Sequence, residues 1–177
     1  GLLMTFESEA AYRDAAYPMA LRRRHGIHMD VLDGNEARQM EPALSDKVVR
    51  AVSIPAVAHT IDPLRFTTAL AADFVRRGGE IVTAEVRGFE MGSGGPSKLV
   101  TDRGPMDVER IVIAAGVWSR TLAAQLGTSV PLEAERGYHV MFANPAIRLR
   151  RAIMSADRSI AMTHMAEGVR ATGVAEF

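Results

Sequence analysis

The stretch with the clearest chemical potential is residues 111–120, where an apolar run meets small residues and then a helix signal. Ala114, Ala115 and Gly116 follow the apolar run, and a helix is predicted to open near Trp118. Small residues at the C-terminal end of a strand let a ligand approach the backbone closely, and a helix N-terminus offers free N–H groups. The alternative is a buried strand followed by a tight turn, because such small residues are common after strands.

Substrate-binding side chains are expected on the C-terminal strands. His139 and His164 lie on predicted strands, where a histidine either lines a pocket or is hydrogen-bonded in the core or at the surface. Arg170 can hold a carboxylate with two parallel hydrogen bonds, or can be an ordinary surface arginine. Only one of the neighbours Tyr138 and His139 can line a given pocket, and we favour His139, with Tyr138 in a packed layer. If their strands form a hairpin, His164 and Arg170 are expected to act together.

The sequence shows no metal motif and no phosphate-binding loop. His25 and His28 are close in sequence, but no carboxylate or further histidine joins them at ligand spacing. The glycine-rich residues 92–98 lie between two predicted strands, and Pro96 supplies no N–H, so we interpret them as a hairpin turn. The Gly-x-Gly-x-x-Gly turn that holds a pyrophosphate on a helix N-terminus is also absent. No metal ligand is therefore predicted.

Bulk composition indicates one globular domain. The 177 residues are 47% apolar and 24% charged, with a formal net charge of zero. No basic stripe with interleaved aromatics is present, so no nucleic-acid partner is expected. The sequence has no cysteine, which excludes a disulfide scaffold and a thiolate metal site. Without a signal-peptide pattern or an apolar run near the roughly 20 residues that span a bilayer, we expect a cytoplasmic protein, either free or peripheral at the inner face of the membrane.

Helical and alternating periodicities predict an α+β fold. Helices are predicted at residues 8–25 with a kink or break at Pro18, at 33–41 behind an Asp33 capping box, at 63–77 behind Asp62, and at 119–126. Strands are predicted at 48–54, 80–90, 98–101, 107–114, 132–142, 159–165 and 169–176. The three strands between 80 and 114 form an antiparallel meander. We therefore expect a mixed, mainly antiparallel sheet flanked by helices, not a doubly wound sheet.

Five short motifs follow one another along the chain. They are Val-Leu-Asp with Glu-Pro-Ala-Leu in 31–44, Ile-Asp-Pro with Gly-Gly and a valine in 61–86, Val-Ile-Ala-Ala-Gly-Val-Trp-Ser-Arg at 112–120, Pro-Leu with Glu-Arg-Gly-Tyr-His in 131–139, and Gly-Val-Arg with Gly and Glu-Phe in 168–177. In this order they resemble the D-amino-acid oxidase/dehydrogenase family of FAD-dependent oxidoreductases, in particular its glycine-oxidase-like members. The similarity spans about residues 30–177. Each motif is short, and the ordered set carries the resemblance.

The resemblance implies that the chain is a central substrate-domain portion of such an enzyme. Residues 1–177 would form a single substrate-binding-type domain, and about 78–127 would hold the meander and the strand–helix segment that returns to the FAD domain. The residues that would contact the cofactor are Val86, Ala114, Ala115, Gly116 and Trp118. The pyrophosphate turn and the family's C-terminal Arg-Pro loop are not found in the sequence. We therefore expect FAD in the full-length protein and little or none on these residues alone.

The resemblance also implies a reaction. A deprotonated amino acid, in this family typically a D-amino acid, gives its Cα hydride to flavin N5, and the imino acid is hydrolysed to a 2-oxo acid. No side-chain base is obligatory, so no catalytic residue is assigned. Tyr138, His139, His164 and Arg170 would lie on the substrate side. Glycine-oxidase-like members place an arginine near the position of His164 or Met165, where this sequence departs, so the carboxylate ligand stays open.

Two alternatives remain at the level of sequence. The enzyme could act on a 2-hydroxy acid or a secondary amine, or the chain could be a non-catalytic binding module of the same fold. The expected partners are a small amino-acid or amine substrate and the remainder of the chain's own FAD domain.

Overall fold

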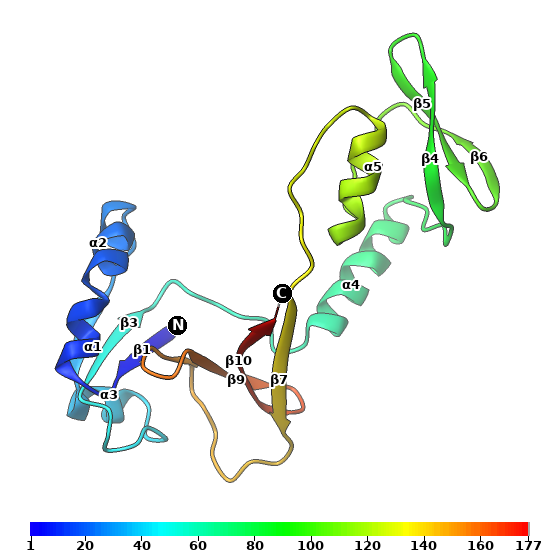
Figure 1. Cartoon of the computed structure of the whole chain (residues 1–177). Coiled ribbons are helices and arrows are strands. Elements are labelled where there is room, and N and C mark those ends of the chain that lie inside the picture. The colour runs from blue at the N-terminus through cyan, green and yellow to red at the C-terminus, as the bar shows by residue number, and fades with distance from the viewer. Residues whose placement is uncertain (177) are drawn as a thin grey trace. The chain divides into compact units, whose positions relative to one another are not determined.

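The computed structural model describes residues 1–176 and divides into two compact units (Figure 1). One unit comprises residues 1–69 and 136–176, and the other comprises residues 70–135. A seven-stranded sheet organises the first unit and a three-stranded sheet the second. The assignment of residues 1–177 to one substrate-binding domain stays a prediction. Among the described residues, no helix is both long enough and apolar enough to cross a membrane.

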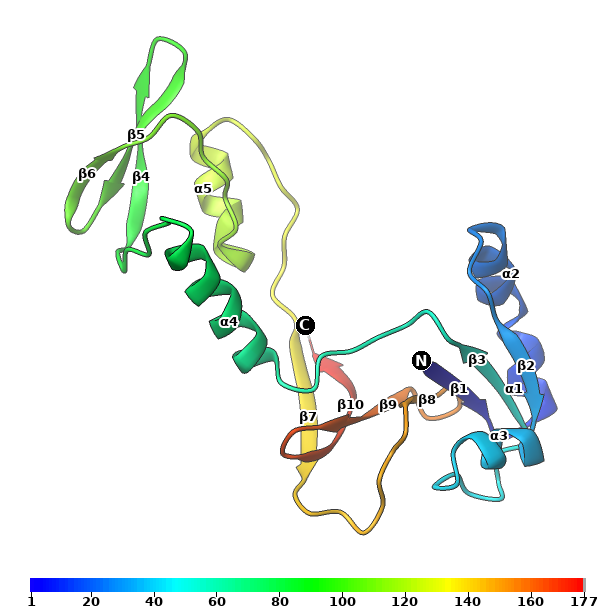
Figure 2. The ribbon, with the colours of Figure 1, turned by 180° about the vertical axis from the view of Figure 1, so that it is seen from behind.

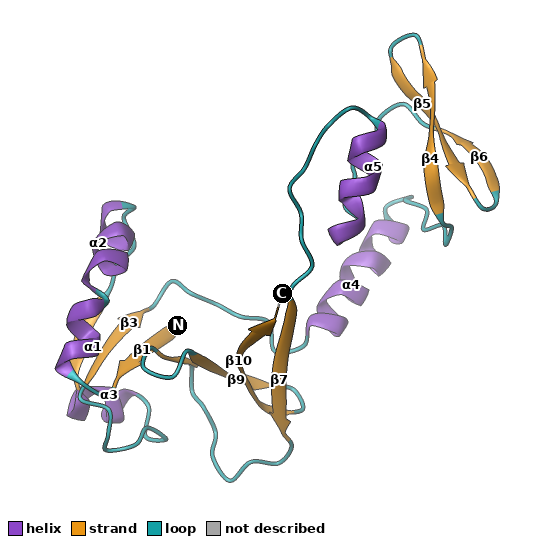
Figure 3. Cartoon of the chain, viewed as in Figure 1, coloured by secondary structure: helices purple, strands orange, loops and turns teal. Residues whose placement is uncertain are grey.

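The large sheet has the strand order β2-β3-β1-β8-β9-β10-β7. Figure 3 draws the strands in orange. Its strands are β1 (Leu2–Phe6), β2 (Asp30–Asp33), β3 (Arg50–Ile54), β7 (Arg136–Phe142), β8 (Ala152–Ser155), β9 (Ile160–Met165) and β10 (Gly168–Glu176). The β1–β8 pair is parallel, and the other neighbouring pairs are antiparallel. The prediction of a mixed, mainly antiparallel sheet is confirmed.

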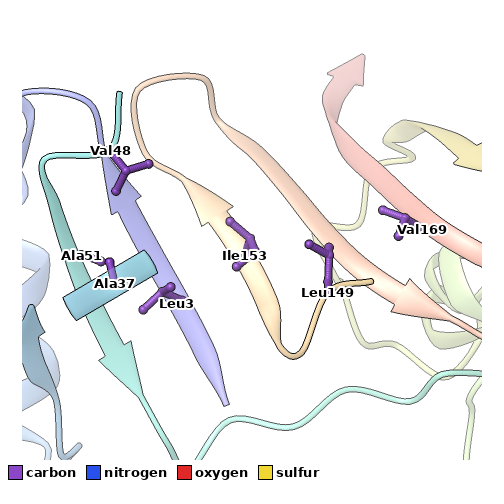
Figure 4. Close-up of a cluster of buried hydrophobic side chains, with 7 residues drawn as sticks. All are labelled: Leu3, Ala37, Val48, Ala51, Leu149, Ile153 and Val169. Carbon is purple, nitrogen blue, oxygen red and sulfur yellow. The ribbon is translucent and has the colours of Figure 1, made fainter. Parts of the chain in front are cut away.

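Two apolar clusters lie on opposite faces of this sheet because side chains alternate along β1. Leu3 packs with Ile153 and Val169 on one face, together with Ala37 of α3 (Figure 4). Phe6 is on the other face, where α2 contributes its side chain Met19. The strand β1 was not predicted from the sequence, yet it joins β3 to β8 at the middle of the sheet.

Three helices accompany these strands: α1 (Glu9–Asp14), α2 (Ala16–Arg24) and α3 (Gly34–Met40). The capping box on α3 is confirmed, since Asp33 accepts the backbone N–H of Glu36 at 2.9 Å and Glu36 accepts that of Asp33 at 2.8 Å. The predicted break at Pro18 lies instead at Ala15, which ends α1 and precedes α2. Pro18 falls in the first turn of α2, where its missing N–H costs no helical hydrogen bond.

The second unit contains an antiparallel meander of three strands, as predicted (Figure 2). Its third strand shares only Asp107 with the strand that was predicted at 107–114. Strands β4 (Val86–Gly92), β5 (Gly95–Thr101) and β6 (Gly104–Asp107) pair antiparallel in sequence order. The helix α4 (Pro63–Arg76) precedes them, and the 3-10 helix η1 (Gly116–Trp118) and α5 (Ser119–Gln125) follow.

The predicted strand at 107–114 is wrong beyond Asp107, because residues 108–115 have no strand structure. A β-strand needs a neighbour for its backbone hydrogen bonds, and no strand within residues 1–176 pairs with this segment. Its Val112 side chain is 90% exposed. For the same reason residues 80–85 and 132–135 lie outside the strands that were predicted to include them.

An ion pair across a long sequence separation predicts a pH dependence of stability. The Arg158 guanidinium donates to both Glu7 carboxylate oxygens, at 2.8 and 3.0 Å, and this lowers the pKa of Glu7. A depressed folded-state pKa means that the contribution is present above the ordinary glutamate pKa and is lost as pH falls through the depressed value. We expect Glu7→Gln to lower the urea midpoint at about pH 7 and to have a clearly smaller effect at about pH 2.5.

The control for this prediction is Glu109→Gln, which removes an exposed carboxylate that forms no ion pair within residues 1–176. It should leave the urea midpoint nearly unchanged at both pH values. A Glu7→Gln effect of equal size at both pH values would contradict the prediction.

Candidate functional site

The predicted substrate residues are distributed over two faces of the large sheet. In the β9–β10 hairpin, His164 lies opposite Val169 and Arg170 lies opposite Thr163. Paired residues point to the same face and successive residues to opposite faces. The hairpin forms as required, but His164 and Arg170 point to opposite faces. The expectation that these two side chains act together is therefore wrong.

His139 and Arg170 share a face. On β7, Met141 pairs with Arg170 and His139 pairs with Thr172, so all four side chains lie on one side of the sheet. Tyr138 points to the other side, in agreement with the predicted alternation. The structure thus brings together one predicted histidine and the predicted arginine.

A pocket of about 290 Å³ surrounds Arg170. Its wall includes acidic, basic and apolar residues, among them Asp62, His139, Met141, Met165, Glu167 and Arg170. The Nε atom of Arg170 is buried and has no hydrogen-bond partner within residues 1–176. Asp62 is already engaged, since one of its oxygens accepts the Arg65 backbone N–H at 2.9 Å at the start of α4. The Arg170 guanidinium is therefore the group in this wall that has a buried N–H without a hydrogen-bond partner within residues 1–176.

The Tyr138 side is not the packed layer that the sequence suggested. Tyr138, Val140 and Phe142 are all exposed on β7, which is an edge strand of the sheet. The Tyr138 hydroxyl donates to a carboxylate oxygen of Glu176 on the neighbouring strand β10. Tyr138 therefore does not line the Arg170 pocket.

His164 lines a larger pocket, of about 830 Å³, which the sequence analysis did not predict. Its polar wall residues are Glu41, His59, Arg148, Arg150, Arg151 and His164. Glu41 belongs to one of the family-like motifs, and nothing in the surrounding sequence indicates that its side chain is completely buried. The run of three arginines within residues 148–151 was the feature that could have indicated a charged site.

The predicted cofactor residues all lie in the second unit. Ala114, Gly116 and Trp118 are exposed, Trp118 by 74%. Gly116 has φ +57°, and a side chain there would meet no atom within 4 Å. The Ala115 N–H is already bonded to the Ser119 hydroxyl at 3.0 Å. This open surface of small residues fits the approach of a flat group such as a flavin.

The fifth predicted cofactor residue, Val86, begins β4 and pairs with Thr101. Its side chain is half-buried. The role of Val86 and of the Ala114–Trp118 segment stays a prediction. Within residues 1–176 no group of three or more histidine, cysteine, aspartate or glutamate side chains could hold a metal ion.

Comparison with known proteins connects these features to one family. The family model described as "DAO: FAD dependent oxidoreductase" matches residues 1–176. A D-amino-acid oxidase of Bradyrhizobium diazoefficiens is 32% identical over 177 residues, which are 100% of this chain and 42% of that protein. A D-amino acid dehydrogenase of Rhizobium rhizogenes is 30% identical over 183 residues, covering 100% of this chain and 44% of that protein. The chain therefore spans less than half the length of these relatives.

Solved structures share the fold at low sequence identity. Glycine oxidase from Geobacillus kaustophilus matches with a TM-score of 0.85 and 24% identity, over 99% of this chain and 47% of that one. L-proline dehydrogenase from P. horikoshii matches with a TM-score of 0.84 and 20% identity, over 98% of this chain and 48% of that one. With the family model matching almost every residue, the chain belongs to the DAO family of FAD dependent oxidoreductases.

Proposed function

We propose that the intact protein oxidises an amino acid, with D-amino acids as the substrate class, using FAD. The observation that carries the proposal is the buried, unpartnered Nε of Arg170 in a pocket shared with His139. A planar guanidinium with an unused donor is suited to a carboxylate, which it can hold with two parallel hydrogen bonds. The names of the relatives, D-amino-acid oxidase and D-amino acid dehydrogenase, support the choice of substrate class.

In this proposal the pocket orients the substrate. Arg170 binds the carboxylate, which fixes one end of the molecule, and the apolar side chains Met141 and Met165 exclude water beside it. His139 lies on the same face and limits the space left for the substrate side chain. The chemistry that FAD supplies when bound is the acceptance of a hydride from the substrate Cα, after which the imino acid is hydrolysed to a 2-oxo acid. The protein's part is binding and orientation.

The acidic residues of the pocket favour an amine over a hydroxy acid. Asp62 and Glu167 line the same wall as Arg170. Such a wall complements a zwitterion, with a carboxylate at the arginine and an ammonium group near the acids. The ammonium group has to lose a proton, to a carboxylate or to water, before the Cα hydride is transferred. A 2-hydroxy acid would leave the acids without a cationic partner, so we place it behind the amino acid, whereas a secondary amine stays an alternative because it also carries a positive charge when protonated.

The cofactor and the location complete the proposal. Val86, Ala114, Ala115, Gly116 and Trp118 would form one wall of the FAD site, and the remainder of the FAD domain would supply the pyrophosphate contacts. A cytoplasmic location also stays a prediction.

The substrate class is tested on the full-length protein. The experiment compares the rates at which it oxidises D-amino acids and 2-hydroxy acids of the same side chain.

Arg170→Ala tests the carboxylate site. Loss of a charged contact to a buried carboxylate costs on the order of 2–5 kcal/mol, so KM should rise at least about tenfold. Steady-state kinetics on the full-length enzyme measure the effect. Arg136→Ala is the matched control, because Arg136 is exposed at the start of β7, outside the Arg170 pocket, and its loss should leave kcat/KM nearly unchanged. If kcat/KM were unchanged for Arg170→Ala and fell strongly for His164→Ala, the carboxylate site would have to be assigned to the face of the sheet to which His164 points.

Gly116→Val tests the cofactor wall. The branched side chain would stand in the open space beside η1, so we expect a lower flavin content in the purified full-length protein. Gly127→Val is the matched control, since Gly127 also has positive φ, +79° against +57°, and a side chain there would likewise meet no atom within 4 Å. Both variants therefore carry similar backbone strain. Equal flavin absorbance in the two variants would mean that residues 114–116 form only a turn.

A chain of residues 1–177 alone should be colourless and should not oxidise D-amino acids, because its sequence contains no Gly-x-Gly-x-x-Gly turn. Titration with FAD, followed by flavin fluorescence, measures this. Stoichiometric binding at about micromolar concentrations would refute the prediction.

A further inference from the structure

The pocket around His164 is separate from the proposed substrate site. It lies on the face of the sheet to which His164 points, opposite the face of Arg170. The two pockets approach each other at Ile61, which contributes to both walls. There the Ile61 carbonyl accepts the N–H of Ala166 at 2.9 Å, which holds this residue against the β9–β10 turn.

The wall of this pocket carries a surplus of positive charge. Three arginines, Arg148, Arg150 and Arg151, face a single acid, Glu41. With the histidines neutral, three positive charges and one negative charge leave a net charge of plus two. None of the three guanidinium groups forms an ion pair with an acid in the part of the chain that the structure describes.

The one acid of the wall is occupied by the backbone. Glu41 is fully buried, and its two oxygens accept the N–H groups of Ala43 at 3.4 Å and of Arg150 at 2.7 Å. The second bond ties the end of α3 to the loop between β7 and β8. Glu41 therefore holds the arginine-bearing loop in place and is not a free counter-charge for it.

Two nitrogen atoms in this wall are buried without a partner. They are Nε of Arg151 and Nδ1 of His164, which make no hydrogen bond within residues 1–176. His59 is fixed nearby, since its Nε2 lies 3.0 Å from the His164 carbonyl oxygen and must donate to it. Buried polar atoms in folded proteins are nearly always hydrogen-bonded, so these two mark places where a ligand atom is expected.

We propose that this pocket is a second ligand site, which binds a small oxyanion, a phosphate or carboxylate group, independently of the Arg170 pocket. The volume, about 830 Å³, accommodates a small organic molecule. Arg151 supplies the buried guanidinium donor, and the exposed Arg148 and Arg150 attract the anion to the opening. His164 adds a donor when its Nδ1 carries a proton. The site rests on these contacts and not on the proposed oxidation of amino acids.

The test is calorimetric titration of the full-length protein with inorganic phosphate and, separately, with succinate at constant ionic strength. Saturable binding of either probe is expected, and the tighter of the two identifies the preferred oxyanion. Arg151→Gln should weaken that binding by at least about tenfold, and Arg148→Gln, at an exposed position that cannot disturb the core, by about threefold.

Two matched variants separate this site from general charge effects and from the Arg170 pocket. Arg103→Gln removes one positive charge from an exposed turn and should change the affinity by less than about twofold. Arg170→Gln should likewise leave phosphate binding unchanged while it weakens amino-acid binding. The proposal is overturned if neither probe binds at concentrations up to about 10 mM, if Arg103→Gln weakens binding as much as Arg148→Gln, or if Arg170→Gln abolishes it.

Discussion

The pairing register between β9 and β10 is the constraint on which both candidate sites depend. A shift by one residue between these strands would bring His164 and Arg170 to the same face, so that one of the two pockets would lose its side chain. Gly168 helps to hold this register. It has φ +140°, and a side chain there would collide with the carbonyl oxygen of Phe142 on β7, so only glycine lets the turn and β7 approach this closely.

The same alternation organises the part of the sheet around β1, where it produces an apolar core. Along β1, Leu3 points to one apolar cluster and Phe6 to the other, and both side chains are fully buried. The ion pair between Glu7 and Arg158 lies beside this strand and joins segments about 150 residues apart. The part of the sheet around β1 is thus closed by apolar contacts. Strands β9 and β10 carry two of the three buried nitrogen atoms that have no partner within residues 1–176, Nδ1 of His164 and Nε of Arg170. The third is Nε of Arg151, which directly precedes β8.

These three buried nitrogen atoms are divided between the two faces of the sheet. Arg170 presents its donor on the face it shares with His139, and Arg151 and His164 line the pocket on the other face. A buried donor without a partner is unfavourable in the absence of a ligand, because it has lost its hydrogen bonds to water. Two such places on opposite faces of the same strands are consistent with two separate anion sites whose charged side chains are not shared.

Local sequence signals predicted most helices and part of the sheet. The capping box at Asp33, the helix start at Asp62 and the meander of β4, β5 and β6 each depend on neighbouring residues, and each was found. The strands β1, β2 and β8 were missed, since runs of four or five residues without clear alternation do not distinguish a strand from a buried helix segment. The strand expected at 107–114 is absent beyond Asp107 for the converse reason, because a strand-like sequence still needs a hydrogen-bonding neighbour.

For the site, the sequence by itself determined the residue types and the alternation that separates Tyr138 from His139. The sequence also contains, in one order, the short motifs that resemble those of the family. Only the tertiary structure decided which side chains share a pocket. Whether two side chains on different strands point to the same face depends on the register between β9 and β10 and not on spacing along one strand. The burial of Glu41 and its bond to the backbone of Arg150 join residues 109 positions apart. Contacts of that kind arise from the folded arrangement of segments, and no local pattern of residues encodes them.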